Sequence, residues 1–234
     1  MLVPYETSQT YEEEIVDEFE NQCEAEFCNY FLASIAENAL NLDLACGNGR
    51  HTLRLSEKAN HVVALDLSPN KLKMAKKKYH DVKNINFIEG SMFELPFKEN
   101  TFDGIWFSHG FEFVPPDKRE MLLSSLNSIL KSTGIFYLSA QAWISPSIWD
   151  SLKRFGRVLG LFCYWRFLKR KPLLWGEGLY YLSPKVAENQ CSCWDYHVYT
   201  DKSTLLELFP RCGFALLKLD VQNGYIYTSC RKTN

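Results

Sequence analysis

The stretch Leu42-Asp43-Leu44-Ala45-Cys46-Gly47-Asn48-Gly49-Arg50 decides the fold, because a short apolar run ends there in a turn with two glycines. A helical pattern follows the turn. Glycine has no side chain, so it adopts positive φ and lets the backbone pass close to a ligand. In open α/β sheets, ligands bind at turns of this kind, at the carboxyl ends of the strands. Glycine-containing turns are common, however, so this stretch alone does not identify a ligand.

Short apolar runs alternate with helical stretches along the rest of the chain. We expect strands in residues 39–45, 60–67, 84–90, 101–108 and 134–140. We expect helices in residues 51–57, 68–79, 117–130 and 203–211, after one or two leading helices within residues 11–37. The expected inner face of the leading helices consists of Ile15, Phe19, Phe27, Phe31 and Ile35. This alternation predicts a mostly parallel sheet that is covered on both faces.

The C-terminal part predicts a hairpin. Two apolar runs, residues 214–221 and 225–232, are joined by a turn that contains Asn223-Gly224, the pair most typical of tight hairpins. With these two strands, we predict an α/β fold with a Rossmann-like, doubly wound sheet of seven strands. The sheet is mostly parallel, with an antiparallel C-terminal hairpin and a helical cap insertion.

Composition predicts one cytoplasmic domain without a metal. The chain has 234 residues, 46% hydrophobic residues and a net charge of −2, which gives no overall attraction to nucleic acid or membranes. The first twenty residues are acidic, whereas a signal peptide begins with basic residues and continues with an apolar run. No apolar run in the chain approaches the ~18 residues of a membrane span. Cys191 and Cys193 form the one close pair among eight cysteines, and we interpret all eight as reduced.

Three residues near the glycine turn indicate which nucleotide fits. Asp66 ends the second expected strand, where a carboxylate can accept hydrogen bonds from both hydroxyls of a ribose. Thr52 stands where the dinucleotide fingerprint requires Gly or Ala. Asp43 would bring a negative charge close to a pyrophosphate. The ligand is therefore expected to carry positive charge.

Four ordered segments resemble a known family, the class I S-adenosylmethionine-dependent methyltransferases, and within it the ubiquinone-biosynthesis and small-molecule type. The segments are LDLACGNGRHTLRL (42–55), VVALDLSPNKLKMAKKK (62–78), INFIEGSMFELPFKENTFDGIWFSHGFEFV (85–114) and LNSILKSTGIFYLSA (126–140). The family usually has glycine at Ala45 and a proline-glycine turn at Ser132-Thr133-Gly134. The resemblance covers residues 38–141 by motif and residues 196–231 by topology.

This resemblance implies a set of contacts to S-adenosylmethionine. The implied residues are Asp43, Ala45, Gly47, Asn48, Gly49, Asp66, Leu67, Ser91, Met92, Phe107 and Ser108. The glycine turn would frame the methionine moiety, Asp66 would hold the ribose, and Phe107 and Ser108 would form the floor near the transferable methyl. Leu67, Ser91 and Met92 would contact the adenine. Ser91 departs from the aspartate that the family commonly has there, and a hydroxyl accepts the adenine amino group more weakly.

The family has no universal catalytic residue, because a sulfonium methyl is already a strong electrophile. His109 follows the fourth expected strand and is the best candidate for a general base, with Glu112 and His197 as weaker candidates. The alternative is that His109 only packs or forms hydrogen bonds in its loop. A different class also stays open, namely a noncatalytic module that binds the cofactor or a partner.

We expect one domain with four parts: leading helices (1–37), a cofactor-binding core (38–141), a substrate-cap insertion (142–199) and a C-terminal helix and hairpin (200–234). The insertion is expected to determine which acceptor binds. Residues 146–188 are expected to form a largely helical cap, and the candidate acceptor contacts are Trp165, Tyr181, His197 and Tyr199. Seven basic residues lie between Lys153 and Lys171, with aromatic residues among them and no acid. A small-molecule acceptor under this cap is our first reading. The same segment could instead bind anionic lipid or RNA, and residues 196–199 resemble a segment of tRNA wobble-uridine methyltransferases.

The nucleotide assignment predicts a selective defect in Asp66→Ala. Both S-adenosylmethionine and its demethylated product should bind more than tenfold more weakly, because two charge-assisted hydrogen bonds of ~1.5–3 kcal/mol each are lost. Calorimetry measures this effect, with NADH as the competitor that should not displace the methyl donor. An unchanged dissociation constant in the variant, or displacement by micromolar NADH, would contradict the assignment.

Overall fold

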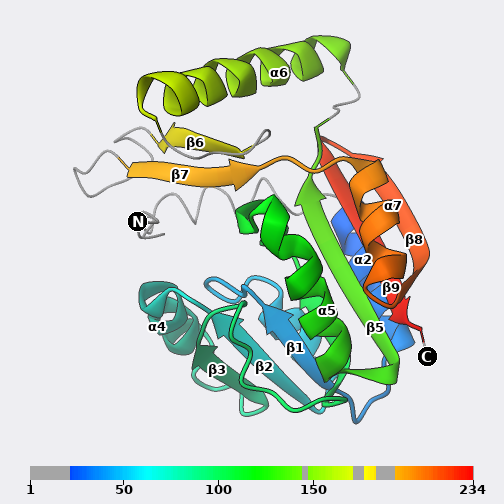
Figure 1. The fold of residues 1–234 in the computed structure, drawn as a ribbon. Helices are drawn as coiled ribbons and strands as arrows, with labels where there is room; N and C mark the ends of the chain where they lie inside the picture. Colours follow the sequence, from blue (N-terminus) through cyan, green and yellow to red (C-terminus); the bar gives the residue numbers. More distant parts are fainter. Residues whose placement is uncertain (1–21, 144–146, 171–176, 183–192, 234) are drawn as a thin grey trace.

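A seven-stranded sheet with the order β3-β2-β1-β4-β5-β9-β8 lies at the centre of the protein (Figure 1). The structure is a computed structural model and describes residues 22–143, 147–170, 177–182 and 193–233. The strands are β1 (Leu40–Leu44), β2 (His61–Asp66), β3 (Ile85–Glu89), β4 (Phe102–Phe107), β5 (Leu130–Gln141), β8 (Phe214–Gln222) and β9 (Tyr225–Lys232). The first five are parallel to one another, and β9 is antiparallel to β5 and to β8. The predicted doubly wound sheet with its C-terminal hairpin is confirmed.

Helices cover both faces of this sheet. α2 (Gln22–Ser34) lies behind it in Figure 1, whereas α5 (Arg119–Ile129) and α7 (Lys202–Arg211) lie in front. α3 (Thr52–Ser56) and α4 (Pro69–Lys78) follow β1 and β2. The positions of α3, α4, α5 and α7 agree with the predicted helices to within one or two residues.

The core on the α2 side is aromatic. Phe27 and Phe31 are fully buried and, as predicted, form the inner face of α2 together with buried Ile35. They pack on Trp106 and Tyr137, whose rings stack with centroids 3.6 Å apart. The other predicted inner-face residues, Ile15 and Phe19, lie outside the described residues.

The turns adopt the backbone conformations that their residues favour. Gly47 and Gly49 have φ of 55° and 84°, and Asn223 and Gly224 have φ of 50° and 80°. Two consecutive residues with positive φ are the mark of a type I′ hairpin turn, which the Asn-Gly pair predicts. Ala45 also has positive φ, 56°, at the position where the family has glycine. An alanine at this φ is strained, because its Cβ is crowded by the backbone, so the turn contains local backbone strain at Ala45.

One expected boundary was wrong. We expected a strand from residue 134, preceded by a turn at Ser132-Thr133-Gly134, whereas β5 already begins at Leu130. Leu130 pairs with Phe102 and Ile135 pairs with Gly104, so the register shifts between these two pairs. Leu130 is fully buried in the main core, so it belongs to the strand. The register shift between Phe102 and Gly104 accommodates the residues between Leu130 and Ile135.

The insertion contains a strand pair that the sequence analysis missed. α6 (Ile148–Cys163) continues into a π-helical turn, Tyr164–Leu168, and is followed by β6 (Glu177–Leu182) and β7 (Cys193–Val198), which pair antiparallel. In Figure 1, α6 lies above β6 and β7, and this strand pair lies above the carboxyl ends of the central strands. The segment is therefore a layered helix-and-strand cap rather than a largely helical one.

The glycine turn yields a stability prediction. A Cβ on Gly49 would lie 2.7 Å from Tyr79 Cε2, at a φ of +84°. Gly49→Ala should therefore lower the free energy of unfolding by at least ~1–2 kcal/mol in urea titrations. The matched control is Gly156→Ala in α6, where a Cβ meets nothing within 4 Å and should stabilise the helix by ~0.5–1 kcal/mol. Equal stability of Gly49→Ala and the native protein would contradict this account of the turn.

Candidate functional site

Asp66, at the end of β2, holds the glycine turn with its carboxylate. Oδ2 accepts a hydrogen bond from the backbone N of Gly47 at 2.8 Å, and Oδ1 accepts one from the backbone N of Ser68 at 2.8 Å. Each carboxylate oxygen can accept a second bond, so these contacts orient Asp66 without exhausting it. The turn after β1 and the end of β2 therefore form one unit.

The surface around this unit fits a nucleoside. A Cβ on Gly47 would meet nothing closer than Lys71 Cδ at 3.9 Å, so the backbone there is open to close approach by a ligand. Leu67, next to Asp66, is 67% exposed and presents the kind of apolar surface that an adenine ring requires. Ser91 and Met92 follow β3 and are half-buried, and Ser91 Oγ accepts from the backbone N of Phe93 at 3.2 Å.

Two residues of the implied cofactor set lie beneath the turn rather than on it. The Asp43 carboxylate is buried and accepts a hydrogen bond from Thr52 Oγ1 at 2.6 Å. Burial raises the pKa of Asp43 to about 7, because the charged form is desolvated, although the bond from Thr52 opposes the shift. The Phe107 side chain is fully buried in the core against Phe111. Only the main chain of Phe107 is in a position to border a ligand.

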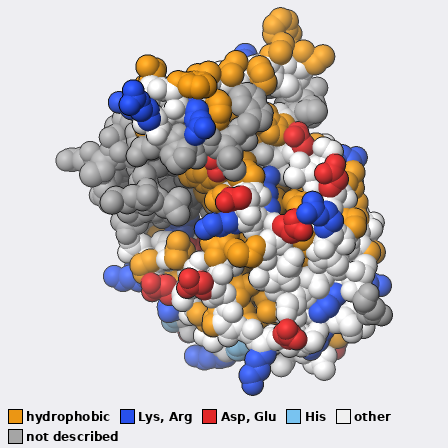
Figure 2. Space-filling model, viewed as in Figure 1, with side chains coloured by type: hydrophobic (Ala, Val, Ile, Leu, Met, Phe, Trp, Pro, Cys, Tyr) orange, Lys and Arg blue, Asp and Glu red, His pale blue; other side chains and the backbone are white. Residues whose placement is uncertain are grey.

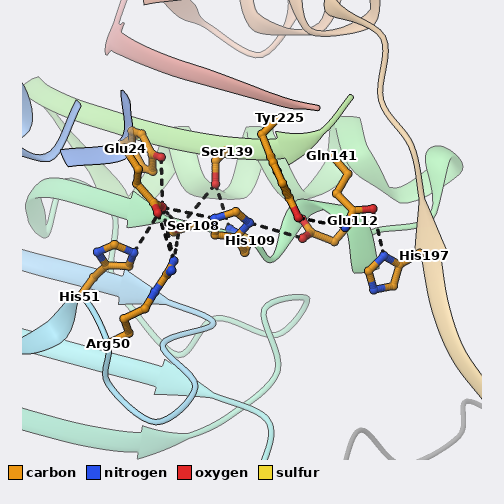
Figure 3. Close-up of polar contacts among 11 residues, drawn as sticks. Glu24, Arg50, His51, Ser108, His109, Glu112, Ser139, Gln141, His197 and Tyr225 are labelled. Atoms are coloured by element: carbon orange, nitrogen blue, oxygen red, sulfur yellow. Dashed lines mark hydrogen bonds and ion pairs between the residues drawn. The ribbon is translucent and has the colours of Figure 1, made fainter. Parts of the chain in front are cut away.

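A buried carboxylate, Glu24 of α2, gathers polar side chains at the ends of β1 and β4 (Figure 3). Ser108 Oγ donates to Glu24 Oε1 at 2.5 Å, and Arg50 Nη2 lies 3.3 Å from Oε2. The Nε2 atoms of His51 and His109 lie 3.3 and 3.4 Å from Oε1. Glu24 is only 2% exposed, so this cluster replaces water around the carboxylate.

The pKa of Glu24 reflects this competition between burial and hydrogen bonding. Burial alone would raise the pKa of Glu24, but hydrogen bonds and charge from His109 and His51 outweigh it and hold the pKa well below its ordinary value. Burial also lowers the pKa of His51, against the opposing effect of Glu24. Glu24 is therefore a permanent carboxylate that can orient the imidazole rings around it.

His109 lies between two carboxylates. Its φ is +50°, a conformation that costs energy for a residue with a Cβ and that often marks functional sites. Its backbone N donates to Ser139 Oγ at 3.0 Å, and its ring meets the edge of Tyr225. Nδ1 faces Glu112 Oε1 at 3.9 Å, which is too long for a hydrogen bond.

Glu112 is the second of these carboxylates. It is 3% exposed, and its Oε2 has no hydrogen-bond partner among the described residues. A buried carboxylate oxygen without a partner is costly, and such atoms are usually satisfied by a ligand or water. A polar group of a bound molecule placed beside the Glu112–His109 Nδ1 gap would satisfy this oxygen.

The site also contains Glu24, Arg50, His51 and Ser139, which the sequence patterns did not indicate. One signal could have found Glu24, because it lies three and seven residues before Phe27 and Phe31 and so on the same apolar helix face. A carboxylate on a buried face requires partners. The partners themselves come from distant segments, and no local pattern indicates them.

The candidate acceptor residues of the cap lie farther along the same edge of the sheet. His197 Nδ1 is 3.2 Å from Gln141 Oε1, and the His197 ring meets Phe113 edge-on. Tyr199 packs on Trp143, and Trp165 meets the ring of Tyr164. The side chain of Tyr181 lies outside the described residues.

Neither a metal centre nor a membrane span is found in the described parts of the chain. No group of three or more His, Cys, Asp or Glu side chains there is arranged to hold a metal ion. Cys191 and the side chain of Cys193 lie outside the described residues. No described helix has the length and apolar character that crossing a bilayer requires.

Comparisons with known proteins agree with this geometry. Residues 42–138 match the model of a family described as "Methyltransferase domain". Demethylmenaquinone methyltransferase of Staphylococcus saprophyticus is 26% identical over 181 residues, which cover 76% of this chain and 71% of that protein. The ubiquinone/menaquinone biosynthesis C-methyltransferase of Wigglesworthia glossinidia brevipalpis is 33% identical over 128 residues, 52% of this chain and 49% of that protein. The match thus spans about half the length of the second relative.

Solved structures share the fold. The 1,6-didemethyltoxoflavin-N1-methyltransferase of Burkholderia thailandensis, with bound 1,6-didemethyltoxoflavin and S-adenosylhomocysteine, superposes with a TM-score of 0.65. The two chains are 17% identical, and the superposition covers 96% of this chain and 84% of that one. At this identity the likeness concerns the fold.

The buried Asp43 predicts an unusual dependence of stability on pH. Because its pKa rises from 3.8 to about 7 on folding, the folded state keeps a proton that the unfolded state releases between these values. The contribution of Asp43 to stability is therefore present below pH ~4 and is lost as pH rises to ~7, at roughly 1.4 kcal/mol per pKa unit. Asp43→Asn should gain stability relative to the native protein over this window.

Urea unfolding of the unliganded protein at several pH values measures this gain. The control is Asp81→Asn, whose carboxylate is 86% exposed and should leave the pH dependence unchanged. A difference between Asp43→Asn and the native protein that stays constant with pH would show that Asp43 ionises normally.

Proposed function

We propose that this chain is a class I S-adenosylmethionine-dependent methyltransferase that transfers a methyl group to a small molecule. The sequence predicted this family, and the family model and the relatives support it. The predicted cofactor is supported by the solved neighbour that holds S-adenosylhomocysteine. A small acceptor is supported by two relatives whose names specify demethylmenaquinone and 1,6-didemethyltoxoflavin. We further propose a cytoplasmic location, which the free cysteines of the described chain fit.

The observation that carries the proposal is the position of His109. It follows β4, the strand that pairs with β1, so it lies beside the glycine turn at the carboxyl edge of the sheet. Glu24 contacts Nε2 of its ring, and Nδ1 faces the gap before Glu112. A proton acceptor is thus fixed next to the site that fits the nucleoside.

Residues of the turn and of β2 would hold the cofactor. Bound S-adenosylmethionine supplies a methyl group on a positively charged sulfur, which needs no further activation. Asp66 would accept hydrogen bonds from the ribose hydroxyls, the open backbone at Gly47 would border the methionine moiety, and Leu67 would pack on the adenine. Ser91 and Met92 lie after β3, beyond Leu67, where the far edge of the adenine would rest.

Glu24, His109 and Glu112 would prepare the acceptor. The Glu24 carboxylate lies 3.4 Å from Nε2 of His109. Its negative charge would favour a proton on Nε2, and this tautomer leaves a lone pair on Nδ1. An acceptor hydroxyl, amine or acidic carbon in the gap would give its proton to Nδ1 as its nucleophilic atom attacks the methyl group. Glu112 Oε2 would accept a hydrogen bond from a second polar group of the acceptor and so fix its orientation.

The cap would cover the acceptor. η1 (Phe111–Phe113) follows β4 and carries Glu112, and the ring of Phe113 contacts His197 of β7. This contact ties the cap to the loop that bears the candidate base. His197, Tyr199 and Trp165 would then set the shape available to the acceptor and keep water from the methyl group.

The catalytic assignment predicts separate effects on turnover and on cofactor binding. His109→Gln should lower kcat about 100-fold, the usual contribution of a general base. Glu24→Gln should lower kcat at least tenfold, because an amide does not fix the His109 tautomer.

Release of S-adenosylhomocysteine in the presence of demethylmenaquinol and a panel of phenols and amines measures turnover, and calorimetry measures cofactor affinity. The matched control is Glu26→Gln, an exposed carboxylate on the same helix, which should leave both unchanged. Full turnover in His109→Gln would remove the proposed base, and equal losses in Glu26→Gln would make the Glu24 effect nonspecific.

A further inference from the structure

The cap helix α6 presents large apolar side chains to solvent. Ile148 is 75% exposed, Trp149 is 73% exposed and Leu152 is 56% exposed, and Leu159 is also exposed. Ile148, Leu152 and Leu159 are spaced by four and seven residues and so share one side of the helix. Figure 2 shows hydrophobic side chains gathered along the top of the molecule, where Figure 1 places α6.

This apolar side is not the side by which α6 is attached to the protein. Val158 is fully buried, and Arg154 donates a hydrogen bond to the carbonyl oxygen of Ala142 and lies over the ring of Tyr199, 4.8 Å from its centroid. These residues anchor the helix on one flank. The exposed stripe, together with Phe167 and Leu168 in the π-helical turn, is left facing outward. We name residues Ile148, Trp149, Leu152, Leu159, Phe167 and Leu168, with exposed Arg157, Arg166 and Arg170, the α6 surface.

The charge of residues 148–170 is predominantly positive, with Asp150 as the one acid. Six Lys or Arg residues and no Asp or Glu lie between Ser151 and Arg170, although the whole chain has a net charge of −2. Arg157, Arg166 and Arg170 are exposed along the same segment. A helix with an apolar stripe, aromatic residues and flanking cations is the type that lies in the interface of an anionic membrane.

We propose that the α6 surface docks on an anionic lipid bilayer, with the helix lying along the membrane plane. The stripe is mostly aliphatic at Ile148, Leu152 and Leu159, and aliphatic side chains enter a bilayer but do not stack on bases as single-stranded RNA requires. A second copy of this chain would place like charges opposite each other in a two-fold interface. At 16 residues, α6 is too short to cross a bilayer and so lies on it.

Docking in this way would place the site close to the membrane. β6 and β7 lie between α6 and the carboxyl edge of the sheet (Figure 1). An acceptor dissolved in the bilayer would therefore reach the cap by a short path. The proposal concerns the α6 surface and does not depend on methyl transfer or on the identity of the acceptor.

Flotation of the full chain with vesicles tests the apolar part. The chain should float with vesicles of phosphatidylcholine containing about 30% phosphatidylglycerol and only weakly with phosphatidylcholine alone, because anionic lipid attracts the cations. Trp149→Ser/Leu152→Ser should bind at least tenfold more weakly. The matched control is Met121→Ser/Leu206→Ser, which removes exposed apolar side chains from α5 and α7 and should bind within twofold of the native chain.

Charge reversal tests the cationic part. Arg157→Glu/Arg166→Glu/Arg170→Glu should abolish binding to the anionic vesicles, and raising NaCl from about 0.1 to 0.5 M should weaken binding of the native chain several-fold. The control reverses three exposed lysines of α4, Lys73→Glu/Lys76→Glu/Lys77→Glu, and should retain binding. Equal loss in this control would overturn the proposal, because binding would then depend on overall charge.

Three other results would overturn it. The first is that the native chain does not float with anionic vesicles. The second is tighter binding to a transfer RNA in anisotropy titrations that Arg157→Glu/Arg166→Glu/Arg170→Glu abolishes, which would assign the surface to RNA. The third is a dimer in light scattering that the same double variant dissociates, which would assign the surface to a second copy. Circular dichroism melting curves confirm that each variant is folded.

Discussion

The buried carboxylate of Glu24 is the interaction on which the site depends. It joins α2 to the turn after β1 through Arg50 and His51, and to the end of β4 through Ser108 and His109. A carboxylate taken out of water is stable only if such donors surround it. Each donor is thereby held in one orientation. The leading helix, which has no part in the cofactor motifs, thus determines how the candidate base is presented.

The order of the strands brings the remaining parts together. β1 lies between β2 and β4, so the glycine turn, Asp66 and His109 leave the sheet at neighbouring positions along one edge. The crossover connections reverse direction here, and ligands of open α/β sheets bind at such points. The cap then covers this edge from the side of η1. α6, the outer element of the cap, carries apolar and cationic residues on its exposed sides.

Local patterns predicted the strands, the hairpin at Asn223-Gly224 and the glycine turn, because each depends on residues that are adjacent in sequence. The β6–β7 pair was missed, since its two strands pair with each other across the insertion and not with the central sheet. Asp43 was expected to face the ligand, whereas its carboxylate is buried and accepts a hydrogen bond from Thr52. The alternation of residues along a strand does not indicate such a partner in the following helix. Glu24 was missed because its donors lie 26 to 85 residues away in sequence, and only the folded chain brings them together.

The central claim is that the turn and Asp66 bind the methyl donor with its sulfur directed to His109. A crystal structure of the protein with S-adenosylhomocysteine tests this claim most directly. The account predicts ribose hydroxyls within hydrogen-bond distance of the Asp66 carboxylate, adenine against Leu67 and the sulfur facing the gap between His109 and Glu112. A ribose bound away from Asp66, or a sulfur separated from His109 by the turn, would contradict it.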